Sequence, residues 1–199
     1  MAAATTERLS AEDRREALLD ATAELVRASG PASVTMGAVA ARAEVTRALV
    51  YKHFANRDDV LTALYRREAG RIDREIRRRV QAADDGFVPQ LTAFVAATLD
   101  LVEGSSAFFA PLREVRDGDQ VRSDQRRRDR RTVAHFVALA RRDFDVDEET
   151  ARTVIAVLLS GIRALLAQSR SHPGADRRAF LVDVYVETAV GALTRLARR

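Results

Sequence analysis

The sequence predicts an all-α protein made of a compact N-terminal unit of three short helices, joined through a longer helix to a helical bundle. Apolar residues recur at helical spacing throughout, and no convincing strand-like alternation of apolar and polar residues occurs. Turn signals such as Gly30-Pro31 and His172-Pro173-Gly174 separate the periodic segments. We therefore expect two domains, residues 1–57 (ordered from about residue 10) and residues 58–199.

The first predicted helix begins after Ser10, which suits an N-cap because Asp13 stands at the capping-box position. It places an apolar face inward and ends near Ser29, since Gly30 and Pro31 stop a helix. The three-residue spacing between Ser10 and Asp13 thus predicts where the fold begins.

Two short helices follow, the first after Thr35 and the second from Thr46 to about Phe54. Each threonine suits an N-cap. The connection between them, Ala43-Glu44-Val45, is short enough for a tight turn.

Five further helices are predicted after residue 55. Asn56 caps a long helix, with Asp58 and Asp59 in the first turn, where acidic side chains favour the helix dipole. The later predicted helices span Phe87 to Glu103, Val133 to Phe144, from Asp147 to about Arg170, and about Asp176 to Arg198. The stretch from Arg113 to Arg131 is charge-dense, and an amphipathic helix resumes at Val133.

Composition favours a globular cytoplasmic protein. The 199 residues are 47% hydrophobic and 31% charged, enough to bury a core, and cysteine is absent, which excludes disulfides and thiolate chemistry. The N-terminus lacks the apolar core of a signal peptide, and we expect no run long enough to span a bilayer. Residues 1–65 carry eight basic and nine acidic residues, so a nucleic-acid surface there has to be a local patch.

Catalytic motifs are missing. The sequence has no HExxH, no glycine-rich phosphate loop and no GxSxG, and its three histidines, His53, His135 and His172, lie far apart. Asp84-Asp85 suits a helix-ending loop better than a metal site. We therefore expect no enzyme activity, no catalytic residue, no metal and no cofactor.

Two short helices with a tight turn, packed on a preceding helix, form the helix-turn-helix arrangement that places a recognition helix in a major groove. Thr35 and Thr46 could offer hydroxyl and backbone N–H groups to phosphates, and Arg57 a further phosphate contact. Tyr51 and Lys52 lie away from the apolar face that includes Phe54.

Arg47 and Ala48 stand at the start of the second short helix, where base edges are read, and Arg47 could pair with guanine through two hydrogen bonds. On the other interpretation, each of these residues is an ordinary solvated side chain.

Residues Leu18 to Leu61 resemble the DNA-binding domain of TetR-family transcriptional regulators. The resemblance covers roughly the first third of the chain. The matching positions are Leu18-Leu19, Ala21, Gly30, Thr35, Val39-Ala40, Ala43, Val45-Thr46, Tyr51, Phe54 and a basic residue opening the next helix.

The resemblance implies a homodimer whose N-terminal helix-turn-helix domains bind a palindromic operator and whose C-terminal domain binds a small effector and dimerises. The positions of this sequence that fall where the family touches DNA are Thr35, Thr46, Arg47, Tyr51, Lys52 and Arg57.

Two residues depart from the family pattern. Glu44 occupies a turn position usually held by glycine, which predicts either a strained left-handed residue or a different turn. Its negative charge also disfavours nearby phosphate. Arg57 replaces the usual lysine and preserves the charge.

The C-terminal part shows no specific motif. The family would place the dimer interface on the last two helices, about Glu148 to Arg170 and Asp176 to Arg198, and the first of these is apolar on more than one face. A deeply buried helix of a monomer is the alternative. The Arg126-to-Arg131 run is read as a solvated helix face, with an anion site or second DNA contact as the other interpretation.

An effector pocket is expected among the middle helices, although aromatic residues at helical spacing can equally form ordinary core. The candidates are Phe94, Thr98, Phe108, Phe109, Phe136 and Leu158, with Arg113, His135 and Gln168 as polar groups.

The predicted function is a ligand-responsive repressor. Two other hypotheses stay open: a non-specific architectural DNA-binding protein, and a helical carrier or enzyme that uses the bundle pocket.

Overall fold

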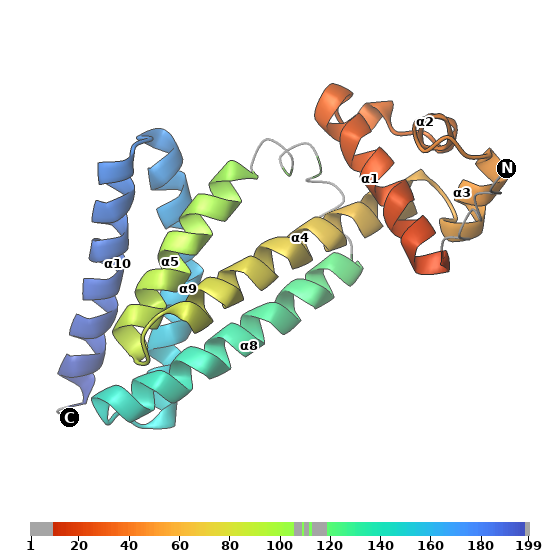
Figure 1. The fold of residues 1–199 in the computed structure, drawn as a ribbon. Coiled ribbons are helices and arrows are strands. Elements are labelled where there is room, and N and C mark those ends of the chain that lie inside the picture. Colours follow the sequence, from red (N-terminus) through yellow and green to blue (C-terminus); the bar gives the residue numbers. More distant parts are fainter. Residues whose placement is uncertain (1–9, 106–108, 110–111, 113–118, 198–199) are drawn as a thin grey trace, which may run out of the picture. The chain divides into compact units, whose positions relative to one another are not determined.

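The computed structural model describes residues 10–105, 109, 112 and 119–197, and every regular element in those ranges is a helix (Figure 1). The predicted all-α class is confirmed. The described chain divides into two compact units, one comprising residues 10–68 with 109, 112 and 119–121, the other residues 69–105 and 122–197.

The first unit holds α1 (Ala11–Ser29), a 3-10 turn η1 (Pro31–Ser33), α2 (Met36–Arg42), α3 (Arg47–His53) and the start of α4 (Arg57–Ala82). The predicted cap of α1 is confirmed, because Ser10 Oγ accepts a hydrogen bond from the Asp13 backbone N–H at 3.0 Å. Ser10 also donates to the Asp13 carboxylate at 2.7 Å. The sequence interpretation missed η1, which proline starts by fixing the backbone at its first position.

The core of this unit gathers side chains from all four α-helices. Phe54 is 1% exposed, and Val39, Val50 and Val60 are fully buried. Burying each such side chain stabilises the fold by about 1.5–3 kcal/mol. The helix-turn-helix is therefore a rigid platform, with its outward residues fixed by inward anchors on the same helices.

The second unit contains α5 (Phe87–Gly104), most of α8 (Asp119–Phe144), α9 (Glu148–Ser171) and α10 (Ala175–Leu196). α10 packs against both α5 and α9 (Figure 1). The largest fully buried side chains of the second unit include Phe87, Phe136, Leu91, Leu99, Ile155 and Leu193.

α8 begins at Asp119, well before the predicted start at Val133, so that boundary is wrong. The prediction that Arg126 to Arg131 form a solvated helix face is confirmed, since the run is helical and mostly exposed. Arginine and glutamine are good helix formers, and side chains four residues apart can support one another. Gln125 Nε2 donates to Asp129 Oδ1 at 2.7 Å in this run. Helix formation here needs no apolar periodicity.

The expectation that no run could span a bilayer is also wrong for α9, which is long and apolar enough by length and composition. These two properties are weak evidence of a membrane span, because the apolar helix of a folded core passes the same test.

Charged side chains join α4, α5 and α10 on the surface of the second unit. Asp100 of α5 contacts Arg79 of α4 at 3.0 Å and Arg178 of α10 at 3.4 Å. Glu75 accepts hydrogen bonds from Arg78 at 2.7 Å and from Arg79 at 3.1 Å. These bonds, the Arg78 bond foremost, lower the pKa of Glu75 to about 2.

Candidate nucleic-acid interface

The turn between α2 and α3 is closed by Glu44, whose φ of 54° is left-handed. Its N–H bonds the Ala41 carbonyl at 3.3 Å, and the Val45 N–H bonds the Ala40 carbonyl at 2.9 Å. This pair of bonds is the Schellman ending that usually employs glycine. Of the two predicted alternatives, the left-handed residue is the one present, and it costs about 1 kcal/mol relative to glycine.

Both short helices begin at a threonine cap, as predicted. Thr35 Oγ1 accepts from the Ala38 N–H at 3.0 Å, and Thr46 Oγ1 accepts from the Leu49 N–H at 3.3 Å. Both threonines are exposed. Because a hydroxyl that accepts one bond keeps its own hydrogen, each can still donate to an external oxygen.

α3 presents its polar residues outward and its apolar residues inward. Tyr51 is 56% exposed and Lys52 is exposed, whereas Val50 is fully buried. Arg47 and Ala48, one turn earlier, are exposed as well, so they lie on the same side of the helix as Tyr51 and Lys52. The structure brings these four predicted residues together on one surface. His53, next to Phe54, is half-buried.

Arg57 is placed differently from the other predicted DNA contacts. Its Nε donates to the Val34 carbonyl at 3.0 Å and its Nη2 to the Pro31 carbonyl at 2.9 Å. The guanidinium is therefore bonded to the backbone of η1 and the residue after it.

Two other arginines, Arg67 and Arg15, hold the helices of the first unit together, and the sequence interpretation missed both. Arg67 of α4 donates to Asp20 at 2.9 Å and to Glu16 at 3.2 Å, and its side chain is only 8% exposed. Burial lowers the pKa of Arg67, but the hydrogen bond and charge of Glu68, the charge of Asp20 and the hydrogen bond of Glu16 together raise that pKa by more. The guanidinium of Arg15 lies 4.4 Å from the centre of the Phe54 ring, a cation–π contact.

The predicted effector-pocket residues fall in several places. Phe108 and Arg113 lie outside the described residues. Phe94, Phe136 and Leu158 belong to the packing of the second unit, where the Phe94 and Phe136 rings meet edge to face at 5.4 Å.

The polar candidates within the described residues have partners or face solvent. Thr98 is 6% exposed and donates to the Phe94 carbonyl at 2.7 Å. His135 is exposed overall, with Nε2 at 2.7 Å from Gln90 Oε1, and partial desolvation of its ring lowers its pKa. Gln168 is exposed.

Phe109 belongs to the first unit, where its ring contacts Tyr65 at 5.1 Å.

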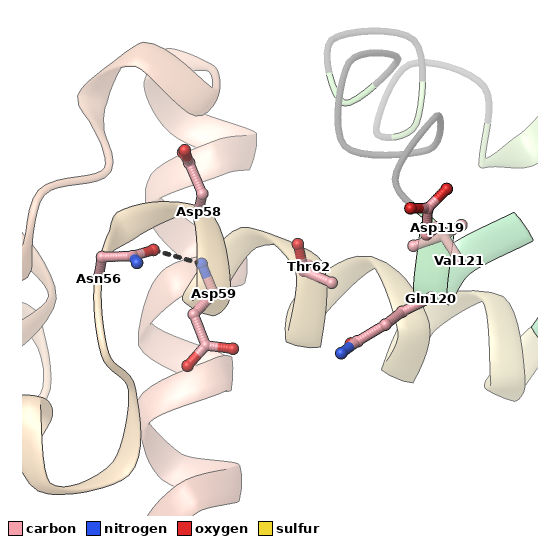
Figure 2. Close-up of a pocket in the computed structure, with 7 residues that line it drawn as sticks. All are labelled: Asn56, Asp58, Asp59, Thr62, Asp119, Gln120 and Val121. Atoms are coloured by element: carbon pink, nitrogen blue, oxygen red, sulfur yellow. Dashed lines mark hydrogen bonds between the residues drawn. The ribbon is translucent and has the colours of Figure 1, made fainter.

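A shallow surface hollow of about 320 Å³ occurs in the first unit (Figure 2). Its lining residues are Asn56, Asp58, Asp59, Thr62, Asp119, Gln120 and Val121. Within it, Asn56 Oδ1 accepts from the Asp59 N–H at 2.9 Å, which confirms Asn56 as the cap of α4. Three of the seven lining residues are aspartates, and only Val121 is an apolar residue.

Residues 18–64 match the family model described as bacterial regulatory proteins of the tetR family. No protein in the curated set matches the chain.

Solved structures share the fold along nearly the whole chain. A candidate transcriptional regulator from Pseudomonas aeruginosa PAO1 has a TM-score of 0.75 and 19% identity, covering 95% of this chain and 96% of that one. A TetR-like transcriptional regulator from Rhodococcus sp. RHA1 has a TM-score of 0.65 and 20% identity, covering 94% and 98%. The fatty acid degradation regulator FadR from Bacillus halodurans has a TM-score of 0.63 and 16% identity, covering 93% and 97%.

The family match lies over the helix-turn-helix, and the shared all-α fold extends through the C-terminal helices. Residues 18–64 are thus similar to the tetR family of bacterial regulatory proteins, and the described chain shares the fold of these solved structures.

Proposed function

We propose that the protein is a ligand-responsive repressor that binds a palindromic operator as a homodimer. The observation that carries this proposal is the outward surface of α3, where Arg47, Ala48, Tyr51 and Lys52 are all exposed on a helix anchored by Val50. A helix held this firmly can keep its outward side chains in register with base edges in a major groove.

The residues divide into two roles. Thr35, Thr46, Tyr51 and Lys52 would bind phosphate oxygens through hydroxyl or ammonium hydrogens, which fixes the position of the domain on the duplex. Arg47 would donate two hydrogen bonds to a guanine, and Ala48 would lie against a base edge or a thymine methyl group. The base contacts would supply the sequence preference.

The homodimer would form through α9 and α10. Val157 is 67% exposed, Phe180 is 53% exposed and Val184 is 45% exposed, so both helices present large apolar side chains to solvent in the isolated chain. Covering such side chains with a second copy removes apolar area from water, which favours association. Dimerisation through α9 would also explain why this helix is so apolar although much of its surface is uncovered in the single chain.

Release from DNA would follow from a small effector bound among the helices of the second unit. α4 runs from Arg57 into that unit, so it links the effector site to the DNA-binding helices. The effector would favour a conformation of α4 that moves the two recognition helices of the dimer apart from the spacing of about 34 Å that successive major grooves require. We expect the protein to act in the cytoplasm, without catalysis or a cofactor.

The test is a selection of duplexes from genomic fragments by the purified protein, followed by affinity measurements on the selected duplex. We expect a palindromic site, and we expect Tyr51→Ala and Lys52→Ala to weaken binding at least about tenfold each, since each removes a phosphate contact. Gln81→Ala, on an exposed position of α4, is the matched control. Equal affinity for the selected and a scrambled duplex would instead indicate an architectural DNA-binding protein.

A further inference from the structure

All three nitrogens of the Arg57 guanidinium have an acceptor within the first unit. Nε and Nη2 bond the carbonyls of Val34 and Pro31, at 3.0 Å and 2.9 Å, and Nη1 bonds Asp58 Oδ1 at 3.2 Å. The two carbonyls lie 23 and 26 residues earlier in the chain. The guanidinium of Arg57, the first residue of α4, thus bonds both η1 and Val34, the residue after η1.

The bonded backbone segment leads directly into a proposed DNA contact. The Pro31 carbonyl also accepts from the Val34 N–H at 3.1 Å, and Val34 is 1% exposed. The next residue is Thr35, the cap of α2. Holding the carbonyls of Pro31 and Val34 therefore fixes the point from which the Thr35 hydroxyl projects.

The surroundings of Arg57 do not favour a phosphate. A phosphate on Nη1 would meet the carboxylate of Asp58, whose side chain is 83% exposed. A phosphate on Nε would have to displace the Val34 carbonyl, and that carbonyl would then need another donor. The second hydrogens of Nη1 and Nη2 are left for a phosphate, and the one on Nη1 lies beside the Asp58 carboxylate. Two carbonyls held by one planar group also require the fork geometry of arginine, which lysine lacks.

We propose that Arg57 is a positioning residue that holds the Pro31–Val34 backbone so that Thr35 is presented to the DNA, and that it is not itself a phosphate ligand. This inference rests on the proposed function, in which Thr35 binds phosphate. On this proposal the role of Arg57 depends on the planar geometry of its guanidinium and not on its charge.

The experiment compares Arg57→Lys, which keeps the charge, with Arg57→Ala, which loses it. The first readout is amide hydrogen exchange in the protein without DNA. We expect both variants to speed exchange at Ser33 and Val34 by roughly tenfold, since each loses charge-assisted bonds to this segment. Exchange at Val26, in the core of α1, reports whether each variant is folded.

The second readout is affinity for a duplex selected by the wild-type protein from a random-sequence library, measured over a range of salt concentrations. We expect Arg57→Lys and Arg57→Ala to lose affinity equally, roughly tenfold, with the salt dependence unchanged, because no phosphate charge contact is removed. Lys52→Ala is the comparison, and should reduce the slope of log affinity against log salt by about 0.9. In a Thr35→Ala background, Arg57→Lys should cause little further loss of affinity for the duplex.

Wild-type affinity in Arg57→Lys, together with a weaker salt dependence in Arg57→Ala, would overturn the inference and make Arg57 a phosphate ligand. Unchanged exchange at Ser33 and Val34 in both variants would overturn it as well. If the wild-type protein selects no duplex, the proposed function fails instead, and the exchange measurement alone decides whether Arg57 holds the segment.

Discussion

The guanidinium of Arg47 lies against Gly37, so closely that a Cβ on Gly37 would stand 2.6 Å from Arg47 Nη2 and 2.9 Å from Nε. Arg47 is the first residue of α3, and Gly37 is in the first turn of α2. The absence of a side chain on α2 therefore provides the space that the proposed base-reading arginine occupies.

Gly37→Ala should displace Arg47 while leaving the fold intact. A flexible guanidinium can move away at low cost, and alanine favours a helix over glycine by up to about 1 kcal/mol, so the melting temperature should hold or rise. Discrimination at the base pair that Arg47 reads should fall by about 1 kcal/mol or more, measured on duplexes that vary that pair.

The control for Gly37→Ala is the same change in an Arg47→Ala background. There the alanine meets no guanidinium, so base preference should not change further. A further change in that background would show that position 37 acts on the DNA by another route.

Glu44→Gly should stabilise the first unit, because glycine adopts the left-handed conformation of residue 44 without the penalty of about 1 kcal/mol that a side chain carries there. Glu44→Ala keeps the left-handed side-chain penalty and serves as the control. Thermal unfolding should give a higher melting temperature for the glycine variant than for the alanine variant. Equal melting temperatures would contradict the strain at this turn.

The pH dependence of stability should include a contribution from Glu75. Its pKa is lowered to about 2 in the folded protein, chiefly by the hydrogen bond from Arg78, against an ordinary value of 4.5. A depressed pKa gives stability that is present above 4.5 and is lost as the pH falls toward 2. The difference in melting temperature between wild type and Glu75→Gln should therefore be largest near neutral pH.

That difference should shrink in concentrated salt, since Glu75 and both arginines are at the surface. A constant difference between pH 7 and pH 2 would mean that the glutamate acts through packing and not through its charge.

Val157→Asp should dissociate the proposed dimer. An unpaired carboxylate buried in an apolar interface costs about 3 kcal/mol or more, which weakens association at least about a hundredfold. Sedimentation equilibrium measures the change. Val88→Asp, at a position that is 42% exposed on α5, is the matched control and should leave the dimer intact.

The sequence predicted the local features of the fold well, because a helix cap depends on residues three positions apart. Ser10, Thr35, Thr46 and Asn56 were all expected as caps, and each accepts the expected backbone N–H. The left-handed turn at Glu44 was one of two predicted outcomes for the same reason.

Contacts between distant residues could not be predicted in this way. Nothing in the sequence marks that Arg57 bonds a carbonyl 26 positions away, or that Arg67 pairs with Asp20, 47 positions away. Arginine is so common in this chain that one more arginine carries no signal. The start of α8 was missed because charged residues can form a helix without an apolar stripe.

Lys52 is the only lysine in the chain, and it stands exposed on α3. Apart from the N-terminal amine, an amine-reactive reagent therefore has a single target, and that target lies in the proposed DNA interface. Acetylation at this one position would remove the only ammonium charge on the side chains, and a fluorophore attached there would report directly on whether the recognition helix is covered. The protein can be labelled site-specifically without introducing a cysteine.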